Sequence, residues 1–322
     1  MPFSLQTIDG SFKGKDIISI DQFSSEDIEI IFNKIHAMKA LVINKEPSTL
    51  LQGYVIALIF YEPSSRTFGS FSSAAKRLGA ATIEYLNPQQ NSSVAKGESL
   101  EDTMQTLQSY AEIIVMRHYE SGAAIKAAGA ASVPLINAGD GGNAHPTSTL
   151  LDLYTIYERF QRLTNLTVVI SGDIVHSRTI KSLIQGLSLY KENKVYLLSP
   201  KELRLEKSDF ERFTKNGIEL IEIFDEKDIP KDANVWYWNR IQKERFPSIQ
   251  EAEKYKGKFI LTEKLLTEYG NNDLIILDPL PRVGEIELAI DNDPRSLYLK
   301  AQIRNSLYVR MALLALVLGK AK

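Results

Sequence analysis

The chain has 322 residues, of which 44% are hydrophobic and 24% charged, a balance typical of a folded protein with room for two domains. Its net charge of −2 provides no overall attraction for nucleic acid or an anionic membrane, so any anion site has to be local. There is no cysteine, which excludes disulfides and thiolate metal sites, and the four histidines show no metal-ligand spacing. The most apolar stretch, Met311–Leu318, is too short to span a bilayer, and the first residues do not resemble a signal peptide. We expect a cytoplasmic protein with no metal, membrane or nucleic-acid role.

The first half of the chain predicts a helix followed by alternating strands and helices. The opening helix runs from about Ser24 to Val42, because Ser24 is a suitable cap and Asp27 stands three residues on. Its apolar stripe consists of Ile28, Ile31, Phe32, Ile35 and Met38. The strands are predicted at Tyr54–Phe60, Ala81–Leu86, Ala111–Met116 and Val133–Asn137, with helices at Ser65–Leu78, Ser99–Tyr110 and Ser121–Ala131.

After a predicted helix at Pro146–Phe160 the alternation starts again. Strands are expected at Leu166–Ile170, Lys194–Leu198, Ile218–Phe224, Asn234–Trp238 and Leu274–Leu277, and a last helix at Asn305–Leu318. The predicted fold is α/β, with two doubly wound domains, each a mainly parallel sheet flanked by helices, and the C-terminal helix packing back on the first domain. We place the domains at residues 1–150 with 303–322, and at residues 151–302. Ligands of such sheets bind beyond the carboxyl ends of the strands.

The segment Glu62-Pro63-Ser64-Ser65-Arg66-Thr67 follows a predicted strand and opens a predicted helix. Hydroxyls and a guanidinium beside the free N–H groups of a helix N-terminus form an anion site. The alternative is that Ser64 or Ser65 simply caps the helix. A cap needs one hydroxyl, and the adjacent Arg66 and Thr67 favour phosphate binding.

A glycine-rich segment, Gly139–Pro146, fits the dinucleotide fingerprint Gly-x-Gly-x-x-Ala, but a lone match of this kind is a weak signal. His145-Pro146 interrupts the place where the fingerprint's helix should continue, and Pro146 suits the first turn of the following helix. His145 is then either a donor or acid–base group facing a ligand, or a structural residue that caps a turn. The pattern does not decide between these two.

Arginines stand close to the ends of three predicted strands: Arg117, Arg178 and Arg240, the last with Gln242 nearby. A single arginine is usually a solvated surface residue. Several at the ligand end of two sheets indicate substrates that carry a phosphate and carboxylates, since guanidinium binds both kinds of anion.

Two further segments have a weaker signal. The polar stretch Asn87–Gly97, with Ser92, Ser93 and Lys96, is either a mobile surface loop or part of a site. Asp278–Arg282 ends a strand with two prolines, which indicates a rigid turn that exposes backbone carbonyls.

Together these segments resemble the catalytic chain of the aspartate carbamoyltransferase family over nearly the full length. The Arg-x-Gln-Lys-Glu-Arg and Leu-Pro-Arg-Val-x-Glu pieces resemble the aspartate enzymes and not the ornithine branch of the same fold. The matching stretches are Phe60–Thr67, Ser92–Glu98, Val115–His118, Asn137–Leu153, Gly172–Ser182, Arg240–Phe246, Leu280–Ile286 and Tyr308–Gly319.

The resemblance implies transfer of a carbamoyl group from carbamoyl phosphate to L-aspartate in pyrimidine synthesis, without a cofactor, by a homotrimer with shared active sites. A regulatory chain or other pyrimidine enzymes are further partners that it allows. By position, Arg66, Thr67, Arg117 and His145 would be catalytic. Carbamoyl phosphate would bind to Ser64, Ser65, Arg66, Thr67, Arg117, His145, Ser148, Leu280 and Pro281, with Pro281 in a cis peptide bond. Aspartate would bind to Lys96, Arg178, Arg240 and Gln242, and Ser93 and Lys96 would come from the neighbouring subunit, with Ser92 as an alternative to Ser93.

Two residues depart from the family pattern next to these positions. Ser148 stands where the family has a glutamine that contacts the carbamoyl amide, and Val175 stands where it has a lysine. Serine is too short for the same contact, and one lost hydrogen bond costs about 1–3 kcal/mol. One alternative function is therefore that of a weakly active or inactive homologue that acts as a binding or regulatory partner. A second alternative, from a different enzyme class, is a dinucleotide-dependent dehydrogenase built on Gly139–Ala144.

Overall fold

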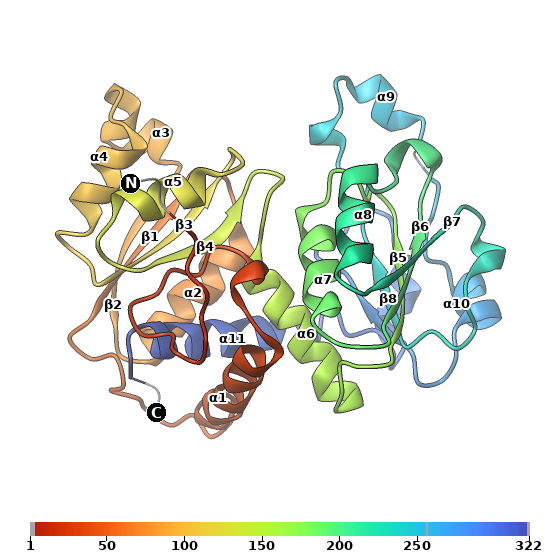
Figure 1. Ribbon diagram of the computed structural model, residues 1–322, viewed down its shortest axis with the longest axis horizontal. Helices are drawn as coiled ribbons and strands as arrows, with labels where there is room; N and C mark the ends of the chain where they lie inside the picture. Colours follow the sequence, from red (N-terminus) through yellow and green to blue (C-terminus); the bar gives the residue numbers. More distant parts are fainter. Residues whose placement is uncertain (1–3, 256, 321–322) are drawn as a thin grey trace. The chain divides into compact units, whose positions relative to one another are not determined.

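The apolar runs of the chain form parallel strands in two separate sheets in the computed structural model, which describes residues 4–255 and 257–320 (Figure 1). The chain divides into two compact units. The first contains the residues up to Leu151 and those from Arg304 onward, and the second is Asp152–Ile303. Both changes of unit fall within helices, the first in α6 (Pro146–Phe160) and the second in α11 (Ala301–Val317).

The sheet of the first unit has the strand order β2-β1-β3-β4 and is parallel throughout. Alternate residues of β1 and β3 pack on α4 and α5, whereas Phe60 of β1 contacts Phe68 of α2 with ring centroids 5.5 Å apart. Helices therefore cover both faces. The strands are β1 (Val55–Phe60), β2 (Ala81–Leu86), β3 (Ile113–His118) and β4 (Leu135–Asp140), and the helices are η1 (Ile20–Gln22), α1 (Ser25–Ile43), α2 (Ser65–Arg77), α3 (Pro88–Asn91), η2 (Ser93–Lys96), α4 (Leu100–Leu107) and α5 (Ala123–Ala130).

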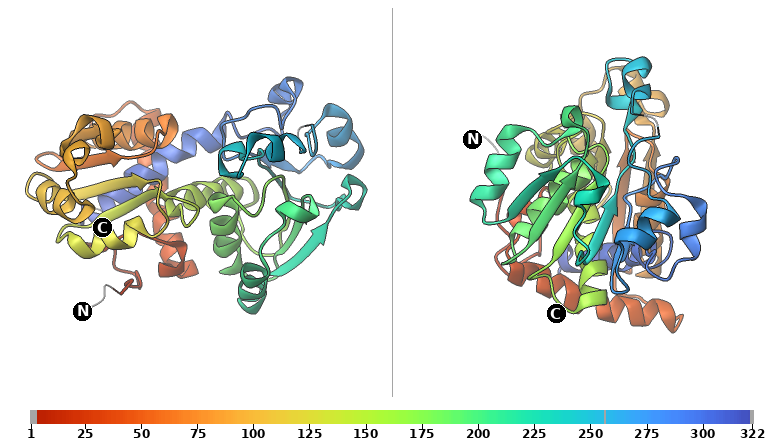
Figure 2. Two further views of the ribbon diagram at one scale, coloured as in Figure 1. Left: turned by 90° about the horizontal axis from the view of Figure 1, so that it is seen from above. Right: turned by 90° about the vertical axis from the view of Figure 1, so that its right-hand side faces the viewer.

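The sheet of the second unit has the order β7-β6-β5-β8-β9, again parallel. Leu265 and Leu266 of α10 pack on one face with Val169 and Trp236, and α7 and α8 lie on the other face (Figure 2). The strands are β5 (Thr167–Ser171), β6 (Lys194–Leu198), β7 (Glu219–Ile223), β8 (Val235–Trp238) and β9 (Ile275–Leu277), and the helices are α7 (Arg178–Ser188), η3 (Lys201–Leu203), α8 (Lys207–Lys215), η4 (Glu226–Asp228), η5 (Lys243–Arg245), α9 (Ile249–Glu253), α10 (Glu263–Tyr269) and η6 (Leu288–Asn292).

The predicted fold class is confirmed: each sheet is parallel and flanked by helices. The last helix packs in the first unit, where the Arg310 guanidinium lies over the ring of Phe71, 5.1 Å from its centroid. The first helix is capped as predicted, because the Ser24 hydroxyl accepts from the Asp27 N–H and the Asp27 carboxylate accepts from the Ser24 N–H. Among the described residues, no helix combines the length and apolar character that crossing a membrane requires.

Several local predictions were wrong in detail, among them the last helix, which starts at Ala301 and not at Asn305. Two strands start two residues later than expected and end two or three residues later, at His118 and Asp140, because backbone pairing continues past the last apolar residue of each. The stretch predicted as the loop Asn87–Gly97 contains two short helices, α3 and η2. Pro88 starts α3 and the Ser92 hydroxyl caps η2, so polar residues here act as helix signals.

Candidate active site

The start of α2 carries the hydroxyls that the sequence marks as an anion site. Ser64 is the N-cap residue, with φ −158° and ψ 91°, but its side chain makes no capping hydrogen bond. Thr67, in the first turn, is buried to 6% exposure, while Ser65 and Arg66 are exposed. Because capping does not use the Ser64 hydroxyl, the cap alternative is not supported. The free N–H groups and hydroxyls of this helix end suit a phosphate.

Arg117 lies within β3, paired in register with Phe60 of the neighbouring β1. Its guanidinium forms an ion pair of 2.6 Å with the carboxylate of Glu62, which stands two residues beyond the end of β1. It also donates to the backbone carbonyl of Ala138 in β4, at 3.3 Å. An arriving anion would compete with Glu62 for this guanidinium.

The turn that leads to His145 is built around the buried carboxylate of Asp140. This carboxylate accepts from the Asn137 amide at 2.9 Å and from the backbone N–H groups of Gly122 and Ala144, at 2.9 and 3.1 Å. Gly141 has a φ of +49°, and a Cβ there would lie 2.5 Å from the Ser121 nitrogen, so only glycine fits.

His145 is 5% exposed and directly precedes α6, with its Nδ1 3.4 Å from the Thr147 hydroxyl. Its carbonyl accepts the N–H groups of Ser148 and Thr149, so the residue also starts the helix. Ser148 is half-buried in the first turn. α6 starts at Pro146, after the Gly139–Ala144 match and not inside it, so the segment does not have the helix position of a dinucleotide fingerprint.

The segment after β2 distinguishes Ser92 from Ser93. The Ser92 hydroxyl donates to the Pro88 carbonyl at 2.7 Å and accepts from the Val94 N–H at 3.2 Å. Ser93 and Lys96 are exposed on η2. Ser92 therefore holds the segment together, and Ser93 and Lys96 are the side chains presented to solvent.

In the second unit the buried carboxylate of Asp173 organises the residues around Arg178. It accepts from the His176 ring Nδ1 at 2.9 Å and from the backbone N–H of Gln242 at 3.0 Å. Arg178 starts α7, which the Ser177 hydroxyl caps. Asp173 thus links the end of β5 to the segment after β8. These two strands come so close at Gly172 that a Cβ there would lie 1.9 Å from the Asn239 carbonyl oxygen.

Arg240 follows β8 and forms hydrogen bonds with both carboxylate oxygens of Glu244, one of them 2.9 Å long. The hydrogen bond from Arg240 lowers the pKa of the Glu244 carboxyl, and the pKa of Arg240 is raised by the same bond. The Arg240 side chain keeps 21% of its surface exposed, so an incoming carboxylate can reach it.

The turn after β9 contains the Leu280–Pro281 peptide bond, which is cis, as predicted. The Asp278 carboxylate accepts from the Leu280 N–H. The Leu280 carbonyl precedes Pro281 in this turn, and Leu280 itself packs against the core of the unit.

The two units therefore each collect part of the predicted set. In the first, the Ser64–Thr67 segment, Arg117 and His145 lie at the carboxyl ends of the neighbouring strands β1, β3 and β4. In the second, Arg178, Arg240 with Gln242, and Leu280-Pro281 follow the neighbouring strands β5, β8 and β9. The described residues include no group of three or more His, Cys, Asp or Glu side chains that could hold a metal ion.

The sequence reasoning missed the acidic residues that hold these groups in place. They are Glu62, Asp140, Asp173 and Glu244. Each stands close in sequence to a strand end, and this position beside a predicted basic residue or turn is the signal that could have found them.

Comparison with known proteins identifies the family. The model of the aspartate/ornithine carbamoyltransferase carbamoyl-P binding domain matches residues 15–158, and that of the Asp/Orn binding domain matches residues 164–317. The chain belongs to the aspartate/ornithine carbamoyltransferase family. Members of this family are transferases, and curated relatives from Pisum sativum and Hyperthermus butylicus are named aspartate carbamoyltransferases.

Three relatives show how far the similarity extends. The aspartate carbamoyltransferase catalytic subunit of Hyperthermus butylicus is 42% identical over 309 residues, covering 96% of this chain and 98% of that protein. Multifunctional protein pyr1-3 of Dictyostelium discoideum is 44% identical over 97% of this chain, which spans 14% of the length of that protein. The crystal structure of aspartate transcarbamoylase from Trypanosoma cruzi in complex with carbamoyl phosphate and aspartate is 33% identical. It has a TM-score of 0.88 and covers 98% of this chain and all of that one.

Proposed function

We propose that this carbamoyltransferase transfers the carbamoyl group of carbamoyl phosphate to L-aspartate, a step of pyrimidine synthesis. The observation that carries the proposal is the convergence of the Ser64–Thr67 helix start, Arg117 and His145 at the carboxyl ends of three neighbouring strands. The aspartate reaction is favoured over the ornithine reaction because Arg178 and Arg240 supply two guanidinium groups, which suit a dicarboxylate acceptor.

Each unit has its own role in the proposal. The first binds the phosphate through Ser64, Ser65, Arg66 and Thr67, with Ser148 beside the carbamoyl group. The second binds aspartate through Arg178, Arg240 and Gln242, and the carbonyl of Leu280, before Pro281, accepts from the carbamoyl amide. Lys96 contacts aspartate, and it comes with Ser93 from a neighbouring subunit of a homotrimer.

The chemistry follows from the charges that develop. An uncharged aspartate amine attacks the carbamoyl carbon, and negative charge builds up on the carbonyl oxygen. Thr67, Arg117 and His145 donate to that oxygen, and fixed donors of this kind contribute most to such reactions. Holding both substrates in line adds an entropic advantage. Collapse of the tetrahedral intermediate then breaks the bond between the carbamoyl carbon and the phosphate oxygen, and the departing phosphate takes the proton that the amine loses.

The Glu62–Arg117 and Glu244–Arg240 ion pairs give this proposal a further physical feature. Both guanidinium groups already have a carboxylate partner at 2.6 and 2.9 Å. The substrate anion replaces that carboxylate or shares the guanidinium with it. Each arginine is therefore oriented before the substrate arrives, and part of the ordering cost of binding is already met.

One assay tests the proposal. Phosphate release is measured with carbamoyl phosphate plus L-aspartate, plus L-ornithine, or with no acceptor, and product is identified as N-carbamoyl-L-aspartate. We expect release that depends on aspartate. Ornithine turnover above aspartate turnover would overturn the substrate assignment. Sedimentation of the purified chain tests the homotrimer, and cell fractionation tests the cytoplasmic location.

Ser148 favours a second candidate, a weakly active homologue that binds these ligands and acts as a regulatory partner of other pyrimidine enzymes. The side chain is half-buried in the first turn of α6, beside His145, and is shorter than a glutamine. This candidate predicts a thermal shift with carbamoyl phosphate but negligible turnover in the same assay.

A further inference from the structure

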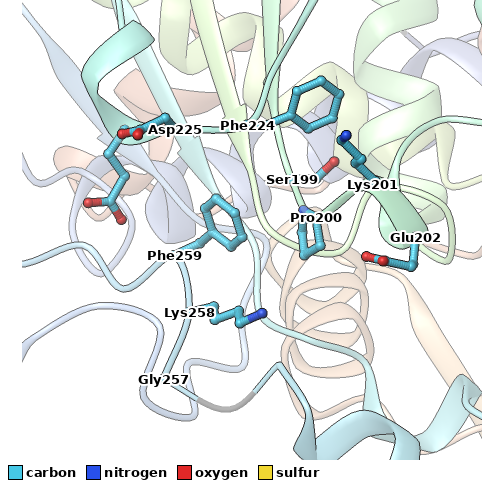
Figure 3. Close-up of a pocket in the computed structure, with 10 residues that line it drawn as sticks. Ser199, Pro200, Lys201, Glu202, Phe224, Asp225, Gly257, Lys258 and Phe259 are labelled. Atoms are coloured by element: carbon cyan, nitrogen blue, oxygen red, sulfur yellow. The ribbon is translucent and has the colours of Figure 1, made fainter.

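The second unit contains a cavity of roughly 530 Å³ beyond the carboxyl ends of β6 and β7 (Figure 3). None of the residues proposed for the acceptor site lines this cavity. Those residues follow the other strands of the sheet, β5, β8 and β9, and are Arg178, Arg240, Gln242, Leu280 and Pro281. The cavity is therefore distinct from the proposed acceptor site. Its wall comes from three segments of the chain, residues 199–202, 224–226 and 257–259.

Two phenyl rings form the apolar part of the wall. Phe224, directly after β7, keeps 43% of its surface exposed, so its ring is accessible to a ligand in the cavity. Phe259 has a φ of +54°, a conformation that a bulky residue rarely adopts. Its carbonyl accepts from the Trp238 indole N–H at 2.6 Å, which holds the backbone in this conformation. Residues held in such a conformation by their surroundings are found at ligand-binding sites.

A hydroxyl also faces the cavity. Ser199 is 1% exposed, and within the described part of the chain its hydroxyl makes no hydrogen bond. Figure 3 shows its oxygen between the ring of Phe224 and that of Pro200. A ligand in the cavity can form a hydrogen bond with this hydroxyl, which is both a donor and an acceptor.

Cations and carboxylates complete the wall. Within residues 4–255 and 257–320, neither Lys201 nor Lys258 has an ion-pair partner, and the Lys201 ammonium lies 5.6 Å from the centroid of Phe224. Glu202, Asp225 and Glu226 add three carboxylates, and Asp225 has Lys227 at 3.9 Å. With carboxylates this close, an inorganic anion alone is a poor occupant. A ligand that carries hydroxyl or amine donors as well as a phosphate satisfies both kinds of charge.

We propose that this cavity binds a nucleoside monophosphate. The base stacks on Phe224 and Phe259, the ribose hydroxyls or a base amine donate to the carboxylates, and the phosphate lies near Lys201, Lys258 and the Ser199 hydroxyl. The volume is within the range of small-molecule sites.

The topology supports the same ligand class. The order β7-β6-β5-β8-β9 is that of strands 3-2-1-4-5 in a dinucleotide-binding sheet, with β5 as the first strand. In such sheets an acidic residue after the second strand binds the adenosine ribose. Glu202 stands four residues after the end of β6, the corresponding strand.

The test is a calorimetric titration of the full-length protein with adenosine 5′-monophosphate, in parallel with tryptophan emission. Both tryptophans lie in β8, and the hydrogen bond from Trp238 to Phe259 makes the emission sensitive to this wall. Phe224→Ala removes one stacking ring, so we expect binding to weaken about fivefold to a hundredfold. The double variant Lys201→Gln with Lys258→Gln should weaken binding of the monophosphate about tenfold and binding of adenosine, which has no phosphate, less than about twofold.

Two further variants make the result decisive. Leu288→Ala removes an equally apolar side chain, 74% exposed, that does not line the cavity, and it should bind as the unmodified protein does. Arg66→Ala weakens the phosphate site proposed in the first unit and should leave the tryptophan response to the monophosphate intact. The proposal is overturned if no binding occurs up to millimolar concentration. It is also overturned if Arg66→Ala abolishes binding while Phe224→Ala has no effect, because the nucleotide then occupies the phosphate site. Both results are independent of whether the chain transfers carbamoyl groups.

Discussion

The two units hold their key arginines in different ways. Arg117 lies inside a strand, is 11% exposed on its side chain, and pairs with a glutamate that comes from the neighbouring strand's end. Arg240 lies in the segment after a strand, is 21% exposed, and pairs with Glu244 only four residues further on. The first arrangement is fixed by the sheet itself, and the second depends on a local segment tethered through Gln242 to Asp173. Residues on strands are placed more precisely than residues on loops.

This difference matches the chemistry proposed for each unit. The donor site stabilises a charge that exists only during the reaction, so its donors need fixed positions. The acceptor site recognises two stable carboxylates, for which a partly exposed arginine on an adjustable segment is sufficient. Substitutions in the first unit should then lower turnover, and those in the second should raise the KM for aspartate.

The largest expected effect is that of Arg117→Ala. Removing a donor to the developing oxyanion lowers kcat by about a hundredfold to a thousandfold. Steady-state kinetics with both substrates, and circular dichroism to verify folding, check this. Arg159→Ala is the matched control, because that arginine is 46% exposed and pairs only at 3.4 Å with Asp273. If the Arg117 variant keeps more than about a tenth of the activity, the oxyanion role is wrong.

Arg240→Ala should have a smaller effect of a different kind. The loss of a charged hydrogen bond to a substrate carboxylate raises the KM for aspartate about tenfold to a hundredfold, with little change in the KM for carbamoyl phosphate. Arg212→Ala in α8 is the control in the same unit, since Arg212 is 49% exposed and pairs with Asp209. A fall in kcat without a change in KM would remove the contrast between the units.

Most of the fold could be predicted from the sequence, and so could the position of the basic candidate residues at strand ends. The reason is physical. Parallel strands buried on both faces form continuous apolar runs, and each predicted strand has a counterpart in the structure. The buried stripe of α1, from Ile28 to Met38, follows from its periodicity. Helices of the second unit gave a weaker signal: in α8 only Phe213 is buried, so no apolar stripe marks its ends.

Other features depend on contacts between distant residues, which local patterns do not specify. Asp173 and Gln242 are 69 positions apart, and no periodicity connects them. Nothing in the sequence marks the cavity beyond β6 and β7 either, because its walls come from three separate segments. A polar residue can also have either of two roles, as Ser92 shows by capping η2 while its neighbour Ser93 stays exposed.

A pH experiment can compare the units by stability. Burial raises the pKa of the Asp16 carboxyl in the first unit to about 6, although the Leu135 N–H donates to it at 2.7 Å. The native state therefore binds this proton more tightly than the unfolded chain, whose pKa is near 3.8. The stabilisation is complete below that value and is lost as the pH rises through about 6.

Asp16→Asn keeps an acceptor for Leu135 without the charge. Relative to the unmodified protein, we expect it to gain about 1–3 kcal/mol of unfolding free energy above pH 7 and almost nothing near pH 4. Urea unfolding at both pH values measures this, followed by circular dichroism and by the emission of the tryptophans, which all lie in the second unit. Equal gains at both pH values would show that charge is not the cause.

The smallest expected effect concerns Ser148. Its side chain is half-buried in the first turn of α6, beside the His145 that starts the helix. The serine side chain is too short to donate to a carbamoyl group that a glutamine at this position would reach. Ser148→Gln should therefore tighten carbamoyl phosphate binding or raise turnover by up to about tenfold, the value of one hydrogen bond.

Ser148→Ala separates this account from its alternative. If the serine makes no contact with the substrate, removing its hydroxyl changes kcat and KM by less than about twofold. A loss as large as tenfold in the alanine variant would mean that the serine itself contacts the substrate. No gain in the glutamine variant would mean that the longer side chain does not fit. Thermal unfolding of both variants distinguishes these two results, because a glutamine that does not fit destabilises α6, whereas loss of a substrate contact leaves the unfolding temperature unchanged.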